Sequence, residues 1–177
     1  KRRFGMKSWT EWDDEDIRCR KSSEVIERYR AELREDVELF TYIQFLFFRQ
    51  WEALKSYIHS LGIRIIGDLP IYVAMDSADV WAEPEMFQLD EHNVPTEVSG
   101  VPPDCFSEDG QLWGNPLYNY EAMAKDGFGW WIRRVGGAQK LYDVIRIDHF
   151  RGFESYWAIP YGETTAKNGR WVKGPGM

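Results

Sequence analysis

The sequence predicts an α/β fold, in which short strands alternate with helices that cross from one strand to the next. Two stretches with apolar residues at helical spacing are each followed by a short β-branched run, at residues 63–70 and 144–149. Both runs end in charged groups, with Asp68 in the first and Asp148 in the second. The order helix, strand, loop, helix, strand is typical of parallel strands joined by crossover helices. Carboxylates at the carboxyl ends of such strands are also what a (β/α)₈ barrel uses for catalysis.

The first predicted elements are a charged segment and a helix. Residues 1–21 are charged and show no clear apolar period, so we expect a peripheral or mobile segment. Ser22, Ser23 and Glu24 predict the start of a helix, because serine is a favourable N-cap residue. Apolar side chains then recur at helical spacing at Val25, Ile26, Tyr29 and Leu33.

The clearest element is the next helix, which leads into the first strand. Its apolar side chains form one stripe, at Ile43, Phe47, Trp51, Leu54, Ile58 and Leu61. Gly62 follows at the position where a helix end favours left-handed backbone. The strand at residues 63–70 comes directly after it.

A stretch rich in proline and glycine separates this strand from the last helix. Residues 84–119 contain Pro84, Pro95, Pro102, Pro103 and Pro116, with Gly100, Gly110 and Gly114. A loop of this length is uncommon in a compact domain unless it has a function. The last helix is expected over residues 128–142, although Gly136 and Gly137 weaken it by about 1 kcal/mol each relative to alanine.

Composition limits the classes of function. A net charge of −7 argues against a nucleic-acid partner, because phosphate binding needs a basic surface. The longest apolar run, residues 39–48, is too short and too polar to span a bilayer. Cys19 and Cys105 form no CxxC motif and the histidines show no zinc spacing, so we predict no metal and a reducing compartment. The nine tryptophans indicate either a core of large side chains or a sugar-binding surface.

Arg146 and Asp148 are the first candidate catalytic residues. On a strand they point to the same face, so the arginine would keep the aspartate ionised and fix its orientation. A carboxylate nucleophile must be ionised, which suits covalent glycosidase chemistry. The alternative is a structural ion pair in a barrel interior.

Further candidates follow the two strands and lie in the loop. Asp68 is either a turn-forming residue or an acceptor for sugar hydroxyls, and His149 is either a donor to a sugar or a core histidine. The loop offers aromatic stacking faces and hydrogen-bonding groups, at Asp104, Phe106, Trp113 and Asn115. The alternative for this stretch is a self-packed surface loop.

Six blocks of the sequence, in order, resemble the 4-α-glucanotransferase family of the α-amylase superfamily. They are residues 47–51 (FFRQW), 62–73 (GIRIIGDLPIYV), 100–104 (GVPPD), 114–118 (GNPLY), 146–153 (RIDHFRGF) and 168–176 (NGRWVKGPG). The resemblance extends over about residues 36–177. It implies that residues 1–177 are a fragment of one catalytic (β/α)₈ barrel domain, with residues 84–119 as a long substrate-covering loop.

The resemblance also implies roles for individual residues. Asp148 would be the nucleophile and Arg146 its support, while His149 borders the donor sugar. Further substrate contacts are expected at Asp68, Asp104, Phe106, Trp113 and Asn115. Cys105 departs from the aromatic residue expected there, which puts one acceptor contact in doubt.

The activity implied is transfer of an α-1,4-glucan segment by a retaining double displacement, without a cofactor. The chain does not begin with Met and ends on residues 174–177 without a closing element, so we expect both ends to be cuts through a longer protein. The resemblance implies that the family's general acid/base glutamate lies on a strand beyond residue 177, so we expect this fragment to be inactive. The expected partners are maltooligosaccharides, starch and glycogen, in a cytoplasm or a plastid. The alternatives are an amylase-like hydrolase and a non-catalytic glucan-binding fragment.

Overall fold

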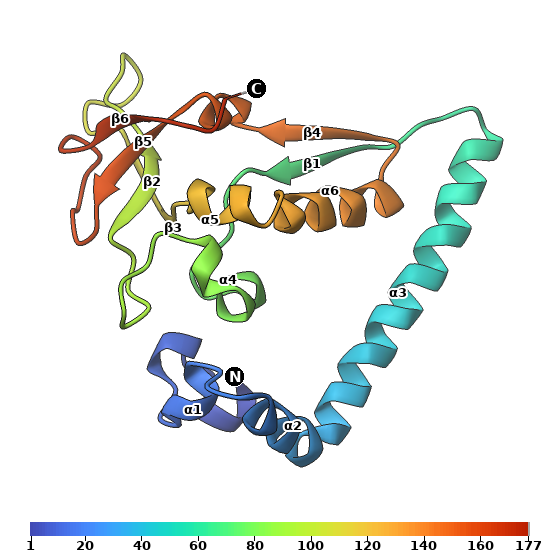
Figure 1. Cartoon of the computed structure of the whole chain (residues 1–177). Coiled ribbons are helices and arrows are strands. Elements are labelled where there is room, and N and C mark those ends of the chain that lie inside the picture. The colour runs from blue at the N-terminus through green and yellow to red at the C-terminus, as the bar shows by residue number, and fades with distance from the viewer. Residues whose placement is uncertain (177) are drawn as a thin grey trace. The chain divides into compact units, whose positions relative to one another are not determined.

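The computed structural model describes residues 1–176 and contains both helices and strands, as predicted for an α/β protein (Figure 1). The chain divides into two compact units. The first comprises Lys1–Gly67 and Gly137–Ile145, and the second comprises Asp68–Gly136 and Arg146–Met177. Three elements run across the division between the units: β1 (Ile66–Pro70), α6 (Gly129–Leu141) and β4 (Val144–Asp148).

The remaining elements belong to one unit each. The first unit contains η1 (Arg2–Phe4), η2 (Trp9–Glu11), α1 (Glu15–Arg18), α2 (Ser23–Glu32) and α3 (Arg34–Ser60). The second contains α4 (Ala78–Ala82), η3 (Pro84–Met86), β2 (Glu97–Val101), β3 (Gln111–Pro116), α5 (Tyr120–Lys125), η4 (Phe150–Phe153), β5 (Ser155–Pro160) and β6 (Arg170–Lys173).

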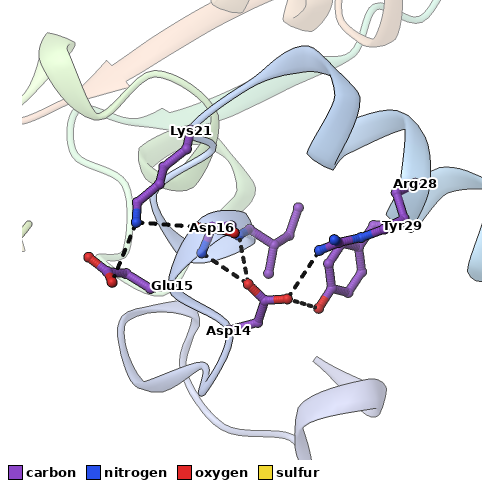
Figure 2. Close-up of polar contacts among 7 residues, drawn as sticks. Asp14, Glu15, Asp16, Lys21, Arg28 and Tyr29 are labelled. Carbon is purple, nitrogen blue, oxygen red and sulfur yellow. Dashed lines mark hydrogen bonds and ion pairs between the residues drawn. The ribbon is translucent and has the colours of Figure 1, made fainter.

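The N-terminal segment is attached to α2 through the carboxylate of Asp14. One oxygen of this carboxylate caps α1 and accepts hydrogen bonds from the backbone N–H groups of Asp16 (3.0 Å) and Ile17 (3.4 Å). The other oxygen accepts from the hydroxyl of Tyr29 at 2.7 Å and from the guanidinium of Arg28 at 3.3 Å (Figure 2). A single carboxylate therefore satisfies a helix N-terminus and also binds the next helix.

The predicted start of α2 is confirmed. Ser22 is its N-cap, and the serine hydroxyl accepts a hydrogen bond from the backbone N–H of Val25 at 3.4 Å. The charged residues ahead of this cap are arranged around it, because Lys21 forms ion pairs with Glu15 (3.4 Å) and Asp16 (3.1 Å) (Figure 2). Local polar contacts thus define the segment that lacks an apolar period.

The long helix α3 ends where glycine predicts it. Gly62 has a φ of 75°, and its N–H donates to the carbonyl of His59 at 2.9 Å, while the N–H of Ile63 donates to Ile58 at 3.2 Å. These two bonds are the Schellman arrangement of a helix C-terminus. None of the residues of α3 is buried. Its exposed apolar side chains are Val37, Leu39, Phe40, Tyr42, Ile43, Phe45, Phe47, Phe48, Leu54 and Tyr57.

The two predicted strands pair with each other. β1 and β4 form a two-stranded sheet, and their arrows point the same way in Figure 1. β1 is shorter than the predicted strand at residues 63–70. Just before β1 begins, a side chain takes the place of a backbone partner in the hydrogen bonds between the two strands. The carboxylate of Asp143 accepts from the N–H of Ile65 at 2.9 Å. The carbonyl of Ile65 accepts from the N–H groups of Asp143 and Val144, at 2.9 and 3.2 Å.

An antiparallel sheet that the sequence does not predict occupies the second unit. Its strand order is β3-β2-β5-β6, so the stretch expected as a loop contains a hairpin of β2 and β3. Gly100 permits this pairing, because a Cβ atom there would collide with the backbone carbonyl of Gln111. The core of the sheet comprises Val98, Ile159 and Ala166, which are 3%, 0% and 0% exposed.

The helix predicted over residues 128–142 is observed as α6. Its apolar spacing predicts one buried face that includes Trp131, Ile132 and Ala138. Trp131 and Ala138 are each 8% exposed, which confirms the prediction, whereas Ile132 is 66% exposed and Trp130, which was not expected on that face, is 4% exposed. The reason is tertiary contact, since both indole rings pack against Tyr118. None of the helices within residues 1–176 combines the length and the apolar character that a membrane span requires.

Candidate active site

The backbone at the end of β4 directs the chain away from the strand immediately after Asp148. Asp148 is the last residue of the strand and is exposed. His149 follows in the left-handed region, with a φ of 54°, and its carbonyl accepts from the N–H of Gly152 at 2.9 Å. This conformation is uncommon outside glycine and is found at functional sites. The carboxylate of Asp148 is therefore presented at a sharp turn between a strand and η4.

Arg146 and Asp68 form a two-pronged ion pair across β1 and β4. The Nε atom of Arg146 lies 3.1 Å from Oδ1 of Asp68, and an Nη atom binds the second carboxylate oxygen. The hydrogen bond from Arg146 lowers the pKa of Asp68, and the same bond raises the pKa of Arg146. Both groups are therefore charged at neutral pH.

The position of Arg146 differs in one respect from the sequence prediction. The fork of the guanidinium binds Asp68, and the negative charge of Asp148 adds to the rise in the pKa of Arg146. Arg146 thus acts on Asp148 through its charge while Asp68 fixes its orientation. Spacing along one strand identified the arginine, but it could not identify a partner on the neighbouring strand.

Trp113 and His149 bring the hairpin and the end of β4 together. Their rings meet edge to face, with centroids 4.9 Å apart and an interplanar angle of 89°. Burial lowers the pKa of His149, the charge of Asp148 opposes this shift, and the charge of Arg151 adds to it. The imidazole is therefore neutral at pH 7 and can donate or accept a hydrogen bond. The indole Nε1 of Trp113 donates to the side-chain oxygen of Gln111 at 3.0 Å.

Asp104 and Phe106 lie on the turn between β2 and β3. One carboxylate oxygen of Asp104 accepts from the backbone N–H groups of Phe106 and Ser107, both at 2.8 Å. The backbone N–H of Asp104 donates to the carbonyl of Ser107 at 3.0 Å. The ring of Phe106 is 94% exposed. These contacts are internal to the turn, so they support the self-packed alternative for its backbone and leave the phenyl ring available for stacking.

Asn115 is engaged with the protein scaffold. Its amide nitrogen donates to the carbonyl of Val73 at 3.0 Å, and its oxygen accepts from the hydroxyl of Ser99 at 3.4 Å. Asn115 therefore links β3 to β2 and to the segment that follows β1. A direct contact with sugar would use the remaining hydrogen-bonding capacity of this amide.

The structure thus gathers some of the predicted residues and not others. Ion pairing, charge and ring contact connect five of them: Asp68, Arg146, Asp148, His149 and Trp113. Sequence reasoning missed Tyr72, which is 8% exposed and whose ring lies 6.3 Å from that of Trp113. Only its place two residues beyond β1 could have drawn attention to it.

The chemistry available at this cluster is that of an exposed carboxylate beside a fixed cation and a neutral imidazole. Such a carboxylate can act as a nucleophile or stabilise a developing positive charge. Among the described residues, no group of three histidine, cysteine or acidic side chains is placed to hold a metal ion.

A family model described as 4-alpha-glucanotransferase matches residues 1–177. A 4-alpha-glucanotransferase of Clostridium butyricum is 52% identical over 178 residues, which cover 100% of this chain and 36% of the relative. One from Aquifex aeolicus is 54% identical over 170 residues, covering 96% of this chain and 35% of the relative. The chain therefore spans about a third of the length of these curated relatives.

A solved structure also matches this chain over almost its whole length. The amylomaltase from Streptococcus agalactiae, in complex with acarbose, superposes with a TM-score of 0.93 at 46% sequence identity. The match covers 99% of this chain and 35% of that one. The described α/β arrangement, including the antiparallel sheet, is therefore one that a larger protein also adopts.

Proposed function

This chain belongs to the 4-alpha-glucanotransferase family, and on that premise we propose that the intact protein transfers a segment of an α-1,4-glucan to the 4-hydroxyl of another glucan or of glucose. The observation that carries the proposal is the exposed carboxylate of Asp148 at the end of β4, beside the charge of Arg146 and the ring of His149. The substrates are maltooligosaccharides, starch or glycogen, and the site of action is the cytoplasm or a plastid.

The mechanism we propose is a retaining double displacement. Asp148 attacks the anomeric carbon and forms a glycosyl ester, while an acid outside residues 1–177 protonates the leaving oxygen. An acceptor 4-hydroxyl then attacks the same carbon and displaces Asp148. Its proton goes to the conjugate base of the acid that lies outside residues 1–177. Retention requires the two carboxyl groups to lie about 5–5.5 Å apart.

The neighbours of Asp148 contribute electrostatics and orientation. Arg146 keeps positive charge next to the nucleophile, and Asp68 holds the guanidinium in place with two hydrogen bonds. His149 is neutral because burial lowers its pKa, so it can bind a sugar hydroxyl as donor or acceptor. The ring of Trp113 limits the movement of His149 through edge-to-face contact.

The hairpin turn supplies the remaining proposed sugar contacts. One oxygen of Asp104 is used by two backbone N–H groups, so the other oxygen is the one proposed to bind a hydroxyl. The exposed ring of Phe106 is proposed as a stacking face, and Asn115 as a further polar contact. The turn would favour transfer over hydrolysis by excluding water from the glycosyl-enzyme.

We extend the proposal to the architecture of the intact protein. Residues 1–177 are proposed to be part of one catalytic (β/α)₈ barrel domain, with residues 84–119 covering the substrate and residues 1–21 at its periphery. The pairing of β1 with β4, each carrying a charged residue toward its end, supports this arrangement.

The experiment that tests the function is incubation of the intact parent protein with maltotriose, followed by separation of the products by chain length. Glucose together with a ladder of longer maltooligosaccharides is the expected result. Glucose and maltose alone would mean hydrolysis, and would show that the hairpin turn does not exclude water. An unchanged substrate would contradict the enzymatic role of Asp148 and favour a glucan-binding protein.

A further inference from the structure

A row of aromatic rings leads from α6 to the candidate active site, and Tyr72 lies at its centre. Tyr72 is 8% exposed, and its ring stacks on that of Tyr118 with centroids 5.7 Å apart and an interplanar angle of 23°. On its other side the ring of Trp113 lies at 6.3 Å and 55°. Trp113 in turn meets His149 at 4.9 Å. Three ring contacts therefore join Tyr118 to the histidine next to Asp148.

The end of this row at Tyr118 is firmly anchored. Tyr118 is 1% exposed, and its hydroxyl donates to the carbonyl of Ile71 at 2.5 Å. Its ring also contacts Trp130 at 5.3 Å and Trp131 at 5.4 Å, both on α6. Tyr118 is thus fixed by a hydrogen bond and by a helix, and it provides a rigid surface for the ring of Tyr72.

The end of the row at Trp113 is not fixed in this way. Trp113 is 37% exposed, and the hydrogen bond of its indole goes to Gln111, two residues earlier on the same strand. Such a local bond moves with the hairpin and does not attach the ring to the rest of the unit. Tyr72 is the aromatic contact that connects Trp113 to the anchored part of the row.

Tyr72 also lies against the turn that follows Asp148. A Cβ atom added to Gly152 would lie 3.6 Å from the hydroxyl of Tyr72 and 2.8 Å from a methyl group of Ile71. Gly152 belongs to the turn whose first residue is His149. The same tyrosine therefore borders Trp113 and the turn that begins at His149.

We propose that Tyr72 is a positioning residue, which holds Trp113 against His149 and so shapes the sugar-binding surface next to Asp148. The inference rests on the proposed function, because it assigns Tyr72 a part in the same site. The ring performs this role rather than the hydroxyl, since both contacts are ring to ring. Burial raises the pKa of Tyr72, so its hydroxyl remains protonated throughout the working pH range.

The test compares Tyr72→Leu and Tyr72→Phe with Phe87→Leu in the intact parent protein. Phe87 is a matched control, because it is 2% exposed and its ring also packs on Tyr118, at 5.5 Å. The other ring contact of Phe87 is Trp130, whereas that of Tyr72 is Trp113. We expect Tyr72→Leu to lower kcat/KM for maltotriose about 10- to 100-fold, mainly through kcat. Tyr72→Phe and Phe87→Leu should stay within about threefold of the parent.

A second measurement does not depend on turnover. The pKa of His149 is read by NMR titration, with its signal assigned by its loss in a His149→Gln variant. The groups that act on His149 are Asp148 and Arg151, and neither is altered. In Tyr72→Leu the released indole should expose the imidazole, so the lowered pKa of His149 should rise toward about 6.5. It should stay low in Tyr72→Phe and in Phe87→Leu.

Three other outcomes overturn the proposal. Equal losses in Tyr72→Phe and Tyr72→Leu would mean that the hydroxyl binds sugar. An equal loss of kcat/KM in Phe87→Leu would mean general destabilisation. An unchanged pKa of His149 in Tyr72→Leu would mean that the position of Trp113 does not depend on Tyr72. If Tyr72→Leu does not fold, Tyr72→Met places a flexible, unbranched side chain in the same space and carries the same expectations. A parent without transferase activity refutes the proposed function alone, because the titration still decides the role of Tyr72.

Discussion

Single residues in the candidate site divide according to what already binds them. The carboxylate of Asp148 ends a strand in an exposed position, whereas Asp68 is paired with Arg146 and Asn115 is bound to the scaffold. A side chain that is already hydrogen-bonded to the protein serves to position other groups. A side chain that is exposed can instead bind a ligand. This distinction yields different expectations for two aspartates on the paired strands β1 and β4.

Asp148→Asn in the intact parent should reduce turnover of maltotriose by at least about a thousandfold, because an amide cannot form the glycosyl ester. Binding of the trisaccharide, measured by calorimetry, should change little, since the side-chain shape is kept. Glu121→Gln is the control, as this exposed glutamate pairs with Lys125 on α5, away from the proposed chemistry. Retained turnover in Asp148→Asn would remove it as the nucleophile.

Asp68→Asn should lower kcat by about tenfold to a hundredfold while leaving the melting temperature nearly unchanged. Both side chains of the Asp68–Arg146 pair are more than half exposed, at 52% and 66%, so their contribution to stability is small. Because the pKa of Asp68 is lowered, the pair should persist above pH 3.8 and break only as the pH falls further. A melting temperature that drops strongly at pH 7 would contradict this view.

The residues that could be predicted are those marked by local patterns. Charged groups at strand ends pointed to Asp68 and Asp148, and the adjacent His149 came with them. Tyr72 was missed because its neighbours, Tyr118 and Trp113, are more than 40 residues away in sequence. Its significance exists only once the chain has folded.

Elements of secondary structure were predictable where the apolar period was long. α3 and α6 were found from their stripes, and the end of α3 from Gly62. The antiparallel sheet was missed, because its strands are four to six residues long and interrupted by Gly100 and Gly114. Short strands are held by partners far away in sequence, so their local pattern is weak.

Gly62→Ala should destabilise the protein by about 1 kcal/mol, because alanine is strained at a φ of 75°. Gly136→Ala is the matched control on α6, where a Cβ atom would meet no other atom within 4 Å. It should stabilise by about 0.5–1 kcal/mol. Urea unfolding of the intact protein measures both changes, and effects of the same sign would contradict the assignment of the two conformations.

The junction of α3, β1 and β4 should weaken in acid through Asp143. Asp143 accepts a hydrogen bond from the backbone N–H of Ile65 and lies beside the side chains of His59 and Lys55. These groups hold the pKa of Asp143 at about 2, below its ordinary value of 3.8. Because the folded pKa is depressed, its contribution to stability is complete above pH 3.8 and is lost as the pH falls through about 2. The difference in melting temperature between the parent and Asp143→Asn should therefore shrink across this range. Asp13→Asn is the control, because it alters an exposed ion pair with Lys7. Its melting temperature should match that of the parent across the same pH range.

At the scale of the whole molecule, the chain covers about a third of its curated relatives. We expect residues 1–177 alone to show no turnover of maltotriose, because they contain the proposed nucleophile but not the proposed acid. The measurement is the same product separation, with the intact parent as positive control. A ladder of products from residues 1–177 would show that the acid lies within them, with Glu154 and Glu163 the first to substitute.

The exposed apolar side chains of α3 have a consequence for biosynthesis. Within residues 1–177 alone, this helix leaves ten large apolar residues open to water, from Val37 to Tyr57. Chaperones that wait at the ribosomal exit bind such segments until the rest of a protein can cover them. Ribosome profiling of chaperone-bound nascent chains would then show engagement beginning soon after α3 emerges.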